Sequence, residues 1–200
     1  ACKAAQTRSD QLLIGITQGG VDEGLRRRSA AELLDVGFDA YAVGGLSVGE
    51  RGADMLVTVD LMDELLPVDR LRYFMGIGDP RGIVDVIARG VDVFDCVLPT
   101  RMARTGTALT RAGRLNLRNA RHADDLRPLD QSCDCPACAG FTRAYLRHLV
   151  MQKEMLAAQL LSLHNLRTLI ALATEARAAI VAGRFADFVA ASETPTPTGE

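Results

Sequence analysis

The sequence predicts an α/β fold in which four consecutive β–α units precede a cysteine-rich segment and long C-terminal helices. Two observations support this prediction. Short apolar runs alternate with stretches of helical spacing between residues 11 and 99. These runs are mostly apolar and do not alternate regularly with polar residues, which is typical of parallel strands that are covered on both faces. Four such units make half of a (β/α)8 TIM barrel, and a doubly wound parallel sheet would give the same rhythm.

The order of the apolar runs gives the expected strands, the helices between them and the strand ends. Because active sites of such barrels lie at the carboxyl ends of the strands, we expect a ligand site where glycine and polar residues follow each strand. Glycine there lets a ligand approach backbone N–H groups closely. The expected strands are 12–16, 40–43, 72–77 and 91–97, the crossover helices are 22–36 and 54–66, and the strand ends are 18–20, 44–46, 76–78 and 95–96.

The chain changes character after residue 99, where arginine and glycine become frequent and the periodicity weakens. A small hairpin is expected at 107–117, and the long apolar periodicity of 141–181 predicts two helices. The domain prediction has three parts. Residues 1–99 form the half barrel, residues 100–191 form an Arg-rich, metal-binding and helical subdomain that completes it, and residues 192–200 form a disordered Pro/Thr-rich tail.

Composition excludes several classes of protein. At 48% apolar and 24% charged residues, the chain is not of the disordered class. No run reaches the roughly 18 to 20 apolar residues of a membrane span, and the first residues lack the apolar core of a signal peptide. We therefore expect a cytoplasmic protein without a membrane partner. Because the chain begins at Ala1 without an initiator Met, we also expect a piece of a longer protein.

Charge is distributed unevenly, although the net charge is only -2. Between residues 101 and 127 there are seven arginines against two aspartates. The planar guanidinium group suits bidentate contacts to phosphate, so this stretch is a candidate nucleic-acid surface. A solvated basic face without a partner would account for the charge equally well.

The five cysteines point to a metal site. Three of them, Cys133, Cys135 and Cys138, lie within six residues, which suits metal binding in a reducing compartment better than disulfides. With His164 they form a Cys3His set, which is typical of closed, structural Zn²⁺ sites. His122 and His148 are alternative fourth ligands, and the pattern would also fit three incidental thiols or an iron–sulfur cluster.

Asp95 is the candidate catalytic residue. It ends the run 91–94, in which only Asp92 is polar, and this places a carboxylate at the mouth of the expected barrel. A carboxylate can act as the nucleophile toward an anomeric carbon and divide one glycosidic displacement into two steps, although such chemistry needs a second acid–base group. The alternative is a structural ion pair with Arg101 or Arg104.

Five segments, in this order, resemble the queuine tRNA-guanine transglycosylase family over nearly the whole chain: 15–20 (GITQGG), 44–50 (GGLSVGE), 73–78 (YFMGIG), 94–101 (FDCVLPTR) and the Cys3His set. The resemblance implies the carboxy-terminal portion of a zinc-containing (β/α)8 barrel of the bacterial type. It implies an enzyme that exchanges the wobble guanine of GUN-anticodon tRNAs (Asp, Asn, His, Tyr) for 7-aminomethyl-7-deazaguanine, in queuosine biosynthesis, through a covalent Asp–RNA intermediate.

The resemblance also implies a role for each matching residue. Asp95 matches the nucleophile. Met75 matches an apolar wall against the base, and Val48 matches the bacterial form. The base-binding set is Gln18, the Gly45–Leu46 backbone and Glu50, and the contacts to the tRNA anticodon loop are Arg101 and Arg104. Each position has a simpler alternative role, because Gln18 could cap a helix, Glu50 could be solvated and Met75 could be core packing.

The matching family members are nearly twice as long, and their general acid–base and base-binding aspartates belong to the half that has no counterpart here. The fragment alone is therefore expected to be inactive. Homodimerisation through the zinc lobe is a further expectation. The alternatives are a non-catalytic accessory subunit of the same family and a zinc-stabilised RNA-binding domain.

Overall fold

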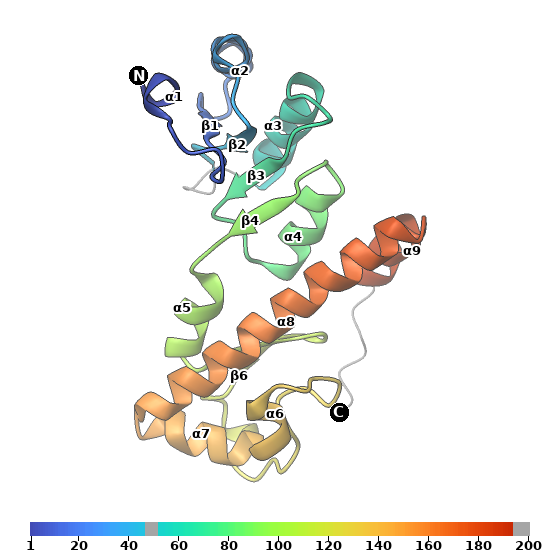
Figure 1. Cartoon of the computed structure of the whole chain (residues 1–200). Coiled ribbons are helices and arrows are strands. Elements are labelled where there is room, and N and C mark those ends of the chain that lie inside the picture. The colour runs from blue at the N-terminus through green and yellow to red at the C-terminus, as the bar shows by residue number, and fades with distance from the viewer. Residues whose placement is uncertain (47–51, 194–200) are drawn as a thin grey trace. The chain divides into compact units, whose positions relative to one another are not determined.

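The structure, a computed structural model, describes residues 1–46 and 52–193 of the chain. It divides into two compact units, residues Ala1–Cys96 and Val97–Glu200 (Figure 1). Each unit is described by itself. The tail expected at 192–200 lies almost wholly outside the described residues, because helix α9 ends at Glu193.

Unit 1 contains the expected parallel sheet. All neighbouring pairs are parallel and the order β1-β2-β3-β4 follows the sequence, so each strand pairs with the one that precedes it in the chain. The four expected strands are confirmed: β2 has the expected bounds, and the other three strands are shorter than their apolar runs. The four strands are β1 (Ile14–Thr17), β2 (Ala40–Val43), β3 (Arg72–Met75) and β4 (Val93–Asp95).

The helices of unit 1 lie between the strands in sequence, as a β–α repeat requires. Asp22 caps α2, because its side chain accepts a hydrogen bond of 2.8 Å from the Leu25 N–H, and Gly37 with φ 72° ends that helix. Helix α2 packs against β1 and α3, and α3 packs against α4, so consecutive helices cover one face of the sheet. The helices are α1 (Cys2–Ala5), α2 (Glu23–Val36), α3 (Gly52–Leu65) and α4 (Pro80–Ile87).

The two faces of the sheet differ sharply in burial. Thr17, Val43 and Phe74 point to the helix side and are at most 2% exposed. On the opposite face Ile16 and Val93 are each 43% exposed. Parallel sheets are normally covered on both faces, so unit 1 presents an apolar sheet face without a cover among the described residues.

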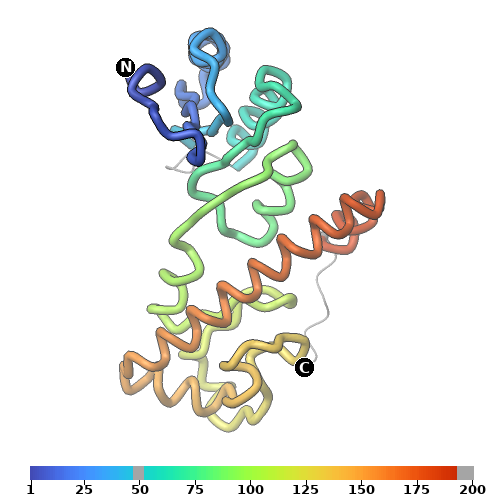
Figure 2. The backbone as a smooth tube through the Cα atoms, in the orientation of Figure 1, coloured from blue at the N-terminus to red at the C-terminus, as the bar shows by residue number. Residues whose placement is uncertain are grey.

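Unit 2 is mainly helical. Its hairpin pairs β5 with β6 in antiparallel fashion, as expected for 107–117, and the two helices expected within 141–181 are α7 and α8, joined by a sharp reversal of the chain (Figure 2). Lys153 adopts φ 59° in this turn. The elements are α5 (Leu98–Arg104), β5 (Thr107–Thr110), β6 (Gly113–Asn116), η1 (Ala120–His122), α6 (Pro136–Gly140), α7 (Arg143–Met151), α8 (Met155–Val181) and α9 (Phe185–Glu193).

Helix α8 organises unit 2, since α5, β5, α6 and α7 all pack against it. It is long and apolar enough to cross a membrane by length and composition alone, and it is the only described helix that meets both criteria. These criteria are weak evidence for a span, because the central helix of a soluble protein also meets them. The core around α8 includes Leu117, Leu129, Leu146 and Leu161, which are fully buried.

Candidate active site and metal centre

The carboxyl ends of the four parallel strands lie along one edge of the sheet in unit 1. Gln18 follows β1, Gly44 and Gly45 follow β2, Met75 ends β3, and Asp95 ends β4. Parallel pairing in sequential order therefore brings together at one edge most of the residues that the sequence predicts for catalysis and base binding. Glu50 and Val48 lie outside the described residues.

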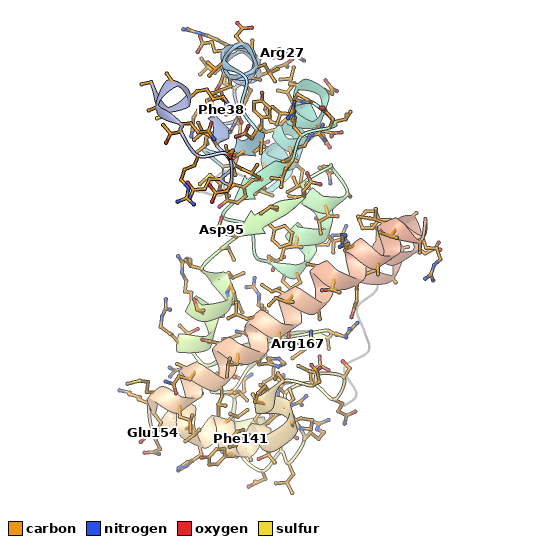
Figure 3. The ribbon with its side chains drawn as sticks, in the orientation of Figure 1. Arg27, Phe38, Asp95, Phe141, Glu154 and Arg167 are labelled. Atoms are coloured by element: carbon orange, nitrogen blue, oxygen red, sulfur yellow. The ribbon has the colours of Figure 1, made fainter. Side chains whose placement is uncertain are left out.

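Asp95 is exposed at the end of β4, where Figure 3 labels it. Its Oδ1 accepts a hydrogen bond of 2.6 Å from the Tyr73 hydroxyl, and its backbone carbonyl accepts one of 3.0 Å from the Gly76 N–H. In the sheet register Asp95 is opposite Met75. The carboxylate is thus oriented by a side chain of the neighbouring strand while one oxygen stays available.

Tyr73 is a part of the site that the sequence prediction missed. The hydrogen bond to Asp95 raises the pKa of Tyr73, and desolvation and the negative charge of Asp95 act in the same direction. The phenol therefore stays protonated and remains a donor to the carboxylate at neutral pH. A signal was available, because Tyr73 lies two residues before Met75 and so shares its face of β3.

Gln18 lies against the backbone of the glycine pair that follows β2. A Cβ built on Gly44 would lie 2.9 Å from the Gln18 Nε2, and one built on Gly45 would lie 2.6 Å from its Oε1. Gly45 also has φ 68°, a conformation that favours glycine. The two glycines therefore allow the Gln18 amide to rest on the peptide. The role of Gln18 as a helix cap is wrong, because Asp22 caps α2.

The remaining predicted contacts differ in exposure. Leu46 is only 5% exposed, so its side chain is buried. Met75 is half-buried on the uncovered face of the sheet. Arg101 and Arg104 are both exposed in the last turn of α5, where a spacing of three residues places them on the same side of the helix. Within the described part of the chain neither forms an ion pair.

In unit 2 the structure brings together the four predicted metal ligands. The ligand atoms of Cys133, Cys135, Cys138 and His164 all lie within 4.8 Å of one another. The His164 Nδ1 is 3.5 Å from the Cys135 Sγ and 3.3 Å from the Cys138 Sγ. Tetrahedral coordination with Zn–S bonds of about 2.3 Å and Zn–N bonds of about 2.0 Å would separate sulfur and nitrogen by about 3.5 Å, so the donor set fits one ion.

The imidazole ring of His164 is oriented to coordinate a metal ion through its Nδ1. The ring is fully buried on α8, and its Nε2–H donates a hydrogen bond of 2.7 Å to the Leu109 carbonyl. This contact leaves the Nδ1 lone pair facing the sulfurs, an arrangement typical of metal-bound histidines. The alternative ligands do not belong to the cluster. His148 is exposed on α7, and the Nδ1 of buried His122 is 3.5 Å from an Asp125 oxygen.

Burial and mutual repulsion disfavour negative charge on the thiols. Desolvation, together with the neighbouring Cys135 and Cys133, raises the pKa of Cys138 to about 12. Desolvation also lowers the pKa of His164, which keeps the imidazole neutral. A divalent cation would offset the charge of the thiolates, so metal binding at this cluster would release protons.

The loop that carries the thiols is fastened to α8 by a second contact. Asp134 lies between two of the ligands, and its carboxylate accepts hydrogen bonds of 2.7 and 3.0 Å from Arg167. Arg167 is three residues after His164 on α8 (Figure 3). The same helix thus carries His164 and an exposed ion-pair partner of the loop that bears the thiols.

Comparison with known proteins gives one consistent result. The family model described as queuine tRNA-ribosyltransferase matches residues 1–195. A queuine tRNA-ribosyltransferase of Novosphingobium aromaticivorans is 55% identical over 89% of this chain and 48% of its own length. That of Thermus thermophilus is 54% identical over 92% of this chain and 48% of its own length. The chain spans about half the length of the curated relatives it matches.

Proposed function

The chain belongs to the queuine tRNA-ribosyltransferase family, and from this we propose that it supplies the nucleophile, part of the base-binding site and the metal-binding lobe of a tRNA-guanine transglycosylase. The observation that carries the proposal is the oriented carboxylate of Asp95 at the carboxyl edge of the parallel sheet, where Gln18 and the Gly44–Gly45 peptide also lie.

The proposed architecture is the carboxy-terminal half of a (β/α)8 barrel. The sequential strand order supports this, because a doubly wound sheet reverses its order at a switch point. The uncovered face of the sheet supports it as well, since Ile16, Val93 and Asp95 would face the interior of a closed barrel. Four further strands, matching the half of the relatives that this chain does not span, would close the barrel.

In the proposed reaction an Asp95 carboxylate oxygen attacks C1′ of the wobble nucleotide. The bond from C1′ to the guanine nitrogen breaks, its electron pair leaves with guanine, and a covalent Asp95–ribose ester forms. The incoming 7-aminomethyl-7-deazaguanine then attacks C1′ through its own ring nitrogen, loses a proton and releases the carboxylate. A general acid–base that moves these protons is expected from the amino-terminal half.

Residues of the same edge bind the base in this proposal. Donors and acceptors of Gln18, together with the Gly45–Leu46 backbone, hydrogen-bond its polar edge, and Met75 packs against the ring. Glu50 is proposed to read the amino substituent. A base that is extruded from its stack needs such contacts, because unstacking costs a few kcal/mol. The exposed Arg101 and Arg104 are proposed to hold the anticodon-loop phosphates of GUN-anticodon tRNAs.

The metal proposed for the Cys3His cluster is zinc, which thiolate and imidazole donors favour. Four protein ligands leave no open position, so the ion stabilises unit 2 and takes no part in the chemistry. We also propose a cytoplasmic homodimer. Exposed apolar residues on α8 support a dimer contact: Met155 is 74% and Ile170 59% exposed.

The test is the Asp95→Asn substitution in the complete protein, meaning this chain joined to the amino-terminal half that its relatives carry. Incorporation of labelled guanine into a GUN-anticodon tRNA should fall at least about a thousandfold, and an RNA adduct on denaturing gels should disappear. Asp92→Asn is the matched control, because Asp92 accepts a hydrogen bond of 2.8 Å from the Arg72 N–H at the opposite end of β4. Unchanged incorporation in Asp95→Asn would show that Asp95 is not the nucleophile and would favour the non-catalytic alternative.

A further inference from the structure

Arg26 is a fully buried arginine of α2 whose guanidinium donates to backbone carbonyls at the carboxyl edge of the sheet. Its Nε donates a hydrogen bond of 2.7 Å to the Gly20 carbonyl, and its Nη2 donates one of 2.8 Å to the Gly44 carbonyl. Its Nη1 lies 3.3 Å from the Thr17 carbonyl oxygen. The side chain therefore joins the ends of β1 and β2 to the loop that follows β1.

The close approach of this loop depends on a glycine. A Cβ built on Gly19 would lie 2.9 Å from the Arg26 backbone nitrogen, and the residue has φ 132°. Glycine at this position lets the loop lie directly on α2, where the Gly20 carbonyl meets the guanidinium. Burying a guanidinium costs free energy unless all of its donors are used, so this arrangement constrains the position of the strand ends tightly.

The contact to Gly44 acts on the same peptide group that offers the N–H of Gly45. The peptide is trans, so the Gly44 carbonyl and the Gly45 N–H point in opposite directions. The charged donor on the carbonyl oxygen fixes the orientation of the peptide plane. It also polarises the peptide, which makes the Gly45 N–H a stronger donor. Gly45 is exposed, whereas Arg26 is buried on the opposite side of the same peptide.

We infer that Arg26 is a positioning residue for base binding: through the Gly44 carbonyl it fixes and polarises the Gly45 N–H that donates to an acceptor of the purine. This inference rests on the proposed function. A preorganised N–H donor binds an acceptor of the purine in the bound complex, and it also stabilises the electron density that builds up on guanine as the base leaves the ribose. The neighbouring Gln18 amide lies on the same peptide and would share the acceptor.

Arg72 provides a matched control within the same unit. It is also buried, at 7% exposed, and its Nη2 donates a hydrogen bond of 2.8 Å to the Leu66 carbonyl. It forms an ion pair with Asp63 as well. Arg72 begins β3, so these contacts lie at the amino edge of the sheet, away from the proposed base site. Substitution by lysine removes a similar set of backbone hydrogen bonds at either position, but only those of Arg26 support the Gly45 peptide.

The experiment compares Arg26→Lys with Arg72→Lys in the complete protein, using labelled guanine as the exchanging base. Both variants should lower the urea midpoint of unfolding. The KM for guanine should rise about tenfold or more in Arg26→Lys, because a charge-assisted hydrogen bond is lost, while the KM for tRNA stays within about twofold. In Arg72→Lys both KM values should stay within about twofold of wild type.

A second measurement needs no variant and decides the question if Arg26→Lys does not fold. In ¹⁵N spectra of the wild-type protein, guanine should shift the guanidinium signals of Arg26 and leave those of Arg72 unchanged. Equal KM effects in the two variants, or an unmoved Arg26 signal while guanine binds, would overturn the inference and leave the proposed function intact. If the wild-type protein incorporates no guanine into tRNA, the proposed function fails and this inference fails with it.

Discussion

Unit 1 leaves one face of its sheet uncovered, whereas unit 2 encloses its core. In unit 1 the apolar side chains of Ile16 and Val93 are each 43% exposed, although the polar groups at the strand ends are satisfied by hydrogen bonds. In unit 2 Leu129, Leu146 and Leu161 are fully buried beside the metal cluster. The difference shows that a unit can satisfy its polar groups locally and still be incomplete in its burial of apolar surface.

The two units are held together by different kinds of polar contact. Unit 1 uses guanidinium groups that hold backbone carbonyls at each edge of the sheet, which fixes the ends of strands but buries little apolar area. Unit 2 uses a buried cluster of ligands and a buried amide on the central helix α8. The guanidinium contacts of unit 1 position the edge of the sheet for a ligand. The ligand cluster and the buried amide of unit 2 stabilise a small domain.

The largest effect is expected from Cys135→Ala, which removes a buried ligand of the cluster. Structural zinc contributes roughly 10 kcal/mol or more of apparent folding free energy in zinc-finger peptides, so unit 2 should lose its metal and much of its helical circular dichroism signal. Metal content by mass spectrometry and ellipticity at 222 nm would measure this. Cys2→Ala is the control, since Cys2 is exposed in unit 1. Full metal content in Cys135→Ala would contradict the ligand set.

The next largest effect is expected from Asn165→Leu on α8. The fully buried amide accepts a hydrogen bond of 2.7 Å from the Leu109 N–H and donates to the Pro99 and Thr107 carbonyls at 2.9 and 3.1 Å. Replacement removes the partner of the buried Leu109 N–H and two hydrogen bonds to carbonyls, so the free energy of unfolding should fall by about 3 kcal/mol or more.

Urea denaturation would measure this loss. Gln159→Leu, at an exposed position of the same helix, should change the free energy by less than about 0.5 kcal/mol. Equal effects of the two substitutions would show that the buried amide does not hold α5 and β5 to α8.

The uncovered sheet face gives the sharpest test of the difference between the units. Ile16→Ser should alter the stability of the 200-residue chain little, because Ile16 is 43% exposed there. In the complete protein the same substitution should cost about 1.5–3 kcal/mol, since a closed barrel would bury the isoleucine. Thermal unfolding of both forms compares the two costs. Equal costs would exclude closure of the barrel over this face.

The smallest effect is expected from pH, through a buried histidine of unit 2. Burial lowers the pKa of His122, so the unfolded chain binds a proton that the folded unit rejects, and stability falls as pH drops below about 6.5. The slope from one such group is at most about 1.4 kcal/mol per pH unit. The hydrogen bond from Arg127 lowers the pKa of Asp125, and its contribution is lost only at more acidic pH, below about 3.9.

Urea midpoints at pH 7.5, 6.5 and 5.5 would resolve the histidine effect. His122→Asn should flatten the dependence, because the titrating group is removed while a polar side chain remains. His148→Asn is the matched control, since His148 is exposed on α7 and should leave the slope as in wild type. A slope that is unchanged in His122→Asn would assign the pH dependence to another group.

The sequence by itself determined the parallel strands and the metal cluster. Short, mostly apolar runs mark the strands because a parallel sheet favours apolar residues. Three thiols within six residues are close in space in almost any local conformation. The sequence left three histidines as candidates for the fourth ligand, and the structure places His164 of α8 beside the sulfurs. Asp95 was predicted from its position at a strand end, which parallel pairing turns into a position on the shared edge.

Only the tertiary structure decided what surrounds the site. Tyr73 reaches Asp95 from a strand 22 positions earlier, and this contact depends on the register of β3 with β4. Arg26 lies in the expected crossover helix 22–36, where the sequence did not single it out, yet the fold buries it against three backbone carbonyls. Local pattern reports which residues prefer burial, whereas the partners of a long polar side chain depend on segments that only folding brings together.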